Sequence, residues 1–169
     1  MGRGKIARAV WVGVLCAMTA AAPAHAQRCW NQTLVEAAQV KEYDVMLMVA
    51  TLRCQAKGVD FSSTYNSFVL THKPILKAVG DEMIRELNTS LGGKAALKAY
   101  DSMSVTMANK YGRGIDGLEC SDFQIMLTEA QASRSTRADL LALAQRAGAD
   151  PVLPAPRCAP PMQTAAATN

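Results

Sequence analysis

The chain has 169 residues, of which 50% are hydrophobic, 19% are charged and 5% are aromatic. This length and composition predict one modest globular domain, and they exclude a collagen, a disordered chain and a large multidomain enzyme. The formal net charge is +4, but the N-terminal segment carries most of that excess.

Residues 1–26 have the pattern of a secretory signal peptide. A basic region precedes an apolar stretch over 9–22, and the small-x-small sequence of a cleavage site ends at Ala26. We therefore expect a mature chain that begins at Gln27 and is periplasmic or secreted. The apolar stretch is shorter than the roughly 20 residues of a membrane-spanning helix, and no later stretch is longer. No transmembrane anchor is expected after cleavage.

Removal of the signal peptide changes the charge of the chain. It takes three of the 18 basic residues and none of the 14 acidic ones, which leaves a net charge of about +1. No later segment gathers lysine and arginine into a stripe. The sequence therefore predicts no nucleic-acid partner, and no adhesion to an anionic membrane by charge alone.

An even number of cysteines remains after cleavage, namely Cys29, Cys54, Cys120 and Cys158. In an oxidising compartment these cysteines predict two disulfides. Lipidation is the alternative for Cys29, but that processing needs a small preceding residue and Arg28 stands there. The spacings contain no CxxC or CxxCH, so no haem, thioredoxin-like redox pair or zinc site is indicated, and no cofactor is expected.

Apolar side chains recur at helical spacing along most of the mature chain. The first predicted helix runs from about residue 33 to 57 and is capped by Asn31 or Thr33. The next begins at Asp60, and Pro74 either kinks it or starts a separate helix that ends before Gly92. Further helices are expected over 94–111, after a cap at Ser121 and after a cap at Ser135.

The predicted fold is thus all-α, an antiparallel bundle of about five or six helices braced by disulfides. It comprises residues 27–149, and a proline- and alanine-rich tail follows over 150–169. Cys29 and Cys54 would lie at opposite ends of the first helix, too far apart to pair. Antiparallel helices bring Cys54 to Cys120, which leaves Cys29 for Cys158.

Few side chains suggest catalysis. His72 is the only histidine of the mature chain, and its place on an apolar helix face favours a core or boundary role over a proton carrier. Glu82 and Glu86 share one helix face, as the two acids of a glycosidase would need, but their polar neighbours indicate a solvated outer face. No GxSxG, HExxH, P-loop or GxGxxG motif is present.

Two further candidate sites follow from local sequence. Met103 and Met107 lie on one side of a predicted helix, where thioethers would bind Cu(I), although methionine is more often core filler. The glycine-rich loop over 112–119 is the better candidate for ligand binding, because glycine lets the backbone approach a ligand. Its candidate binding residues are Asn109, Tyr111, Arg113 and Asp116.

Several short segments resemble a group of small, secreted, helical proteins of Gram-negative bacteria that carry no assigned function. The segments are residues 46–54, 65–68, 99–101, 108–112 and 118–120. The resemblance implies a periplasmic helical domain with paired cysteines and supplies no catalytic residues. Because the core is well patterned and catalytic motifs are missing, we expect a non-catalytic binding or structural protein that contacts an unidentified protein or envelope component. The alternatives are a small envelope-acting hydrolase and a methionine-based copper-binding protein.

Overall fold

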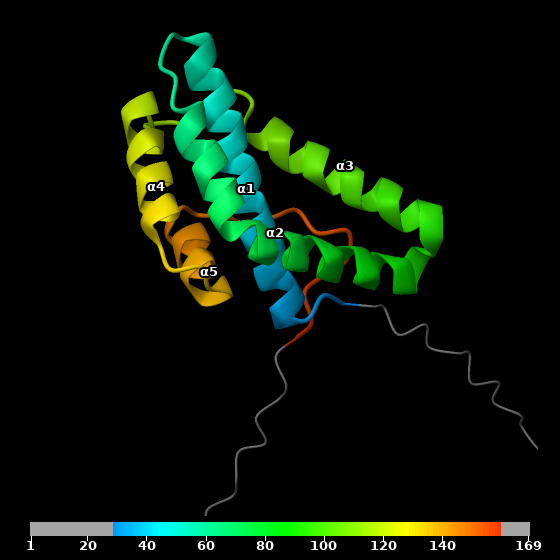
Figure 1. Cartoon of the computed structure of the whole chain (residues 1–169). Coiled ribbons are helices and arrows are strands. Elements are labelled where there is room, and N and C mark those ends of the chain that lie inside the picture. Colours follow the sequence, from blue (N-terminus) through cyan, green and yellow to red (C-terminus); the bar gives the residue numbers. More distant parts are fainter. Residues whose placement is uncertain (1–28, 160–169) are drawn as a thin grey trace, which may run out of the picture.

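The structure is a computed structural model that describes residues 29–159. It is all-α over these residues, as predicted, and the helices form a bundle around the first of them (Figure 1). The proposed signal peptide and cleavage site lie outside the described residues. The helices are α1 (Gln32–Ala56), α2 (Ser62–Leu91), α3 (Gly93–Tyr111), α4 (Cys120–Ala132) and α5 (Arg137–Arg146).

Helix α1 is the centre of the bundle and contacts each of the other four helices. Its side chains are buried on nearly every face from Leu34 to Cys54, as expected for a helix that is covered all round. The Asn31 side chain caps it by accepting a hydrogen bond from the amide of Leu34. The predicted cap and length of this helix are confirmed.

Helix α2 is one continuous helix with Pro74 inside it, which decides between the two predicted arrangements. Figure 1 shows that it bends in its middle: the first half lies along α1, and the second half extends outward beside α3. Proline has no amide hydrogen, so the carbonyl of Leu70 loses its helical partner and the helix can bend there. The second half of α2 and helix α3 together form a projecting helical hairpin, called the arm below.

Three helix starts differ from the prediction. Glu119, not Ser121, caps α4, in a reciprocal capping box with Asp122. Thr136, not Ser135, caps α5 by accepting from the amide of Asp139. Asp60 lies one residue before the cap position of α2 and accepts from the amide of Ser62. Neighbouring polar residues can all serve as caps, so the sequence did not distinguish between them.

Both predicted disulfides are present. Cys54 pairs with Cys120 at one end of α1, and Cys29 pairs with Cys158 at the other. Trp30 adds two backbone hydrogen bonds to the second link, donating to the carbonyl of Pro156 and accepting from the amide of Cys158. The C-terminal segment up to Ala159 is therefore held against the start of α1, and the rest of the predicted tail lies outside the described residues.

Candidate functional site

The middle of α1 carries a polar interruption that the sequence analysis did not single out. Lys41, Glu42, Tyr43 and Asp44 follow one another in the most buried helix of the bundle. Asp44 is well paired, since it accepts from Lys41 (3.1 Å) and from the hydroxyl of Tyr65 (3.1 Å). Glu42 is the exception. In the sequence, this cluster could have been recognised by its adjacent charged residues, which interrupt a helix whose neighbouring turns are apolar.

Glu42 is fully buried. Its Oε1 accepts a hydrogen bond of 2.9 Å from the Nζ of Lys110 on α3, and the same Nζ donates to the carbonyl of Asp150 at 3.0 Å. The other carboxylate oxygen, Oε2, has no hydrogen-bond partner among the described residues. A buried carboxylate is stable only when it is paired, so Lys110 keeps this charge tolerable within the bundle.

Tyr111, next to Lys110 at the end of α3, lies in the same cluster as Glu42 and Lys110. The Lys110 Nζ lies 5.4 Å from the centroid of the Tyr111 ring, within range of a cation–π interaction. Burial raises the pKa of the Tyr111 hydroxyl well above its ordinary value, and the negative charges of Glu42 and Asp150 raise it further. Tyr111 is therefore a neutral phenol at physiological pH.

A cavity of about 260 Å³ opens beside this cluster, between the end of α3 and the end of α5. Its lining combines two polar residues with small and apolar ones, namely Lys110, Tyr111, Gly114, Ile115, Ala147 and Gly148. An ammonium has three hydrogens, and Lys110 uses two of them on Glu42 and Asp150. Among the described residues no acceptor takes the third.

The glycine-rich loop over 112–119 supplies fewer of the predicted binding residues to the cavity than its sequence suggested. Of its candidate residues, Tyr111 lines the cavity, whereas Asn109, Arg113 and Asp116 are exposed and do not line it. The backbone carbonyl of Arg113 accepts a hydrogen bond of 3.1 Å from the guanidinium of Arg53. The loop is thus tied to α1 by its backbone.

His72 is a satisfied core residue, as the sequence favoured. It is fully buried, and its Nε2 lies 2.9 Å from the carbonyl of Ala130. Because a carbonyl only accepts, Nε2 carries the proton and Nδ1 is left facing the hydroxyl of Ser135 at 3.4 Å. The ring also packs against Phe68, with 5.1 Å between centroids. These contacts join α2 to α4 and to the loop before α5.

The other sequence candidates lie in the core or against the start of α1. Met103 and Met107 are both buried in the core. Glu82 and Glu86 are half-buried rather than on a solvated outer face, because they lie beside the start of α1. Glu82 Oε2 pairs with the guanidinium of Arg137 at 2.6 Å.

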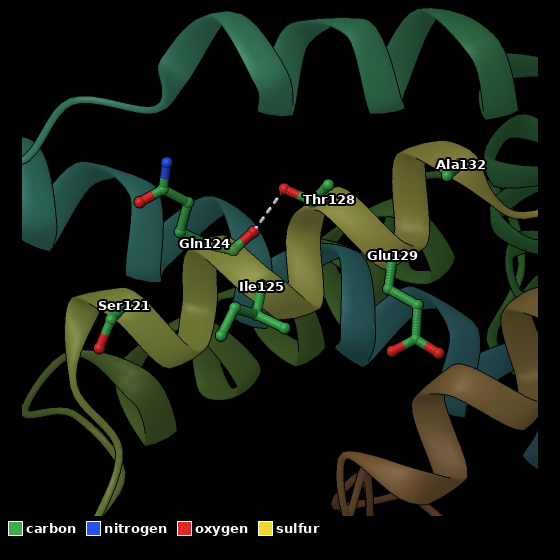
Figure 2. A pocket seen from close by; sticks show the side chains of 6 residues that line it. All are labelled: Ser121, Gln124, Ile125, Thr128, Glu129 and Ala132. Atoms are coloured by element: carbon green, nitrogen blue, oxygen red, sulfur yellow. Dashed lines mark hydrogen bonds between the residues drawn. The ribbon is translucent and has the colours of Figure 1, made fainter.

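A surface hollow of about 600 Å³ lies along the outer face of α4 (Figure 2). Figure 2 shows Ile125 and Glu129 on one side of that helix, and the hydroxyl of Thr128 donates to the carbonyl of Gln124 on the same helix. Its lining comes from α4 alone, and it contains no buried polar group. It is therefore a weaker candidate than the cavity beside Glu42.

Within residues 29–159, histidine, cysteine and acidic side chains form no cluster of three that would hold a metal ion. None of the helices in this part of the chain is long and apolar enough to cross a membrane. No protein-family model, curated protein or solved structure matches the chain.

Proposed function

We propose that this chain is a non-catalytic binding protein of the bacterial cell envelope, located in the periplasm. Its ligand would bind in the cavity beside the glycine-rich loop. The observation that carries this proposal is the ion pair between buried Glu42 and Lys110, a residue of the cavity lining whose ammonium has one hydrogen without an acceptor among the described residues. A ligand oxygen is the natural partner for that hydrogen.

The charges around the cavity narrow the class of ligand. Of the residues that line the cavity, Lys110 alone is charged, and Glu42 already balances that charge at 2.9 Å. The site therefore favours an uncharged ligand. A sugar hydroxyl or a peptide carbonyl can accept from Lys110, while Ile115 and Ala147 provide apolar contact. Envelope glycans and their peptides carry both groups.

The role of the ionisable residues supports binding rather than catalysis. A general base must reach the proton that it removes. His72 is enclosed between α2 and α4 and bonded to a backbone carbonyl. Tyr111 has a raised pKa and remains protonated.

The periplasmic location is supported by the signal-like N-terminus and by two disulfides. Cell fractionation followed by N-terminal sequencing tests it. We expect the oxidised chain in the periplasmic fraction with Gln27 first. Recovery of the full-length chain in the cytosol with free thiols would contradict the proposal.

Binding is tested by amide chemical-shift mapping with two probes, an N-acetylglucosamine disaccharide and an alanine tripeptide. We expect at least one probe to shift the amides of Lys110, Tyr111 and Gly148. Ala147→Leu narrows the cavity and should abolish the shifts, whereas Ala138→Leu, at an exposed position of α5, should preserve them. Absence of localised shifts with both probes, or shifts that persist in Ala147→Leu, would contradict this binding site.

A further inference from the structure

Residues 88–98 form the tip of the arm, and all of them except Ala96 are exposed. Every residue from 88 to 95 is exposed, across the Gly92–Gly93 turn that joins α2 to α3. Figure 1 shows the arm projecting away from α4 and α5, so the tip can approach a flat surface without contact from the rest of the bundle.

Two leucines lie at this tip with more than half of their surface open to solvent. Leu91, the last residue of α2, is 53% exposed and Leu97, in the second turn of α3, is 52% exposed. Because both leucines lie at the end of the arm, neither side chain reaches the core of the bundle. The tip therefore presents apolar surface that residues 29–159 leave uncovered.

The charged residues of the tip have one sign. Lys94 and Lys98 are both exposed and lie one helical turn apart, and residues 87–100 contain no acidic residue. This local excess is not evident from the whole mature chain, whose charges nearly cancel. A projecting apolar tip with flanking lysines suits the headgroup region of an anionic bilayer, where leucine enters the acyl boundary and lysine stays at the phosphates.

We propose that the tip of the arm attaches this protein to the surface of membranes that contain anionic lipid. A second copy of the chain fits less well, because a symmetric contact would bring the lysines of the two tips together. This inference does not depend on a ligand in the cavity beside Glu42, and the two tests use different residues. With two leucines and two lysines the attachment is weak and reversible.

Flotation of the mature, oxidised chain with lipid vesicles tests the proposal. We expect co-flotation with vesicles rich in phosphatidylglycerol, little with phosphatidylcholine alone, and release as the salt concentration rises. Replacing each lysine should weaken the partition by about fivefold. Lys94→Glu/Lys98→Glu should therefore abolish co-flotation, whereas Lys57→Glu/Lys73→Glu, an equal charge change at other exposed positions, should leave it unchanged.

A fluorescence measurement locates the contact. Trp30 is buried and is the only tryptophan of the proposed mature chain. Leu91→Trp should therefore report insertion by a blue shift with anionic vesicles, while Ile125→Trp on the outer face of α4 should show none. Failure to float, equal flotation with both lipids, or a dimer that forms through Leu91 and Leu97 without vesicle binding would each overturn the proposal.

Discussion

The ammonium of Lys110 joins the buried carboxylate of Glu42 to the backbone carbonyl of Asp150. It thereby connects three segments far apart in sequence: the middle of α1, the end of α3 and the segment after α5. The Lys110 side chain remains 41% exposed, whereas that of Glu42 is 1% exposed. The pair is therefore unequal, with a fully desolvated anion held by a cation that reaches in from the surface.

Removal of Lys110 should be costly because it leaves that anion unpaired. We expect Lys110→Met to lower the free energy of unfolding by about 3 kcal/mol, the lower end of values for a broken buried pair. Urea denaturation at neutral pH measures it. Glu42→Met/Lys110→Met, which removes both charges, should recover most of the loss. If the double variant is no more stable than the single one, the unpaired charge is not the cause.

Alanine at Gly114 is predicted to be destabilising, because the backbone there has a positive φ and the end of the Arg53 side chain lies against it. Its φ is +100°, and a Cβ there would lie 2.7 Å from both terminal nitrogens of the Arg53 guanidinium. We expect Gly114→Ala to cost about 1–2 kcal/mol from backbone strain alone. The contact with Arg53 adds to that cost because the guanidinium must leave the carbonyl of Arg113.

Gly117 provides the matched control, since its φ is +80° and an added Cβ would meet nothing within 4 Å beyond its chain neighbours. Gly117→Ala should show the strain without the clash, so Gly114→Ala should be the more destabilised of the two by thermal unfolding. In an Arg53→Ala background the difference between them should shrink. Equal stabilities of Gly114→Ala and Gly117→Ala in the wild-type background would show that Arg53 is not the constraint.

The sequence predicted the helices and disulfides because both depend on regular patterns. Periodicity placed α1 and α3 to within two residues, and the alternating direction of helices paired Cys54 with Cys120. The candidate cavity was less accessible to prediction. Tyr111 was identified from its neighbouring glycines, but Glu42 and Lys110 are 68 residues apart, and no local pattern indicates that they meet.

Each disulfide should contribute to stability according to the loop that it closes. The chain-entropy relation gives about 4 kcal/mol for Cys54–Cys120 and about 5 kcal/mol for Cys29–Cys158, as upper estimates, from sequence separations of 66 and 129. We therefore expect Cys54→Ser/Cys120→Ser and Cys29→Ser/Cys158→Ser each to lower the midpoint of thermal unfolding strongly.

Limited proteolysis should distinguish the two links. Loss of Cys29–Cys158 leaves the C-terminal segment held by its two backbone hydrogen bonds to Trp30 and by the packing of Leu153 and Ala155 on the core, so cleavage should begin after α5. Loss of Cys54–Cys120 should instead expose the segment between α3 and α4. Identical cleavage patterns in the two double variants would contradict the separate roles given to these bonds.

High pH should destabilise the fold through its buried tyrosines. Burial is the main cause that raises the pKa values of Tyr43, Tyr65 and Tyr111 above the ordinary value of about 10. Nearby carboxylates raise them further, Glu129 for Tyr43, Asp44 for Tyr65 and Glu42 for Tyr111. The folded chain thus holds protons that the unfolded chain releases above pH 10.

The sign of the effect follows from that difference. The contribution of these phenols to stability is complete below pH about 10 and declines as the pH rises toward the folded pKa values. Ultraviolet absorbance of tyrosinate, followed together with helical circular dichroism, measures it. We expect ionisation of these three tyrosines to coincide with loss of helix. In Tyr65→Phe, unfolding should shift to higher pH, because one releasable proton is removed. Absorbance at pH 10 that shows all three tyrosines ionised in a fully helical chain would contradict their burial.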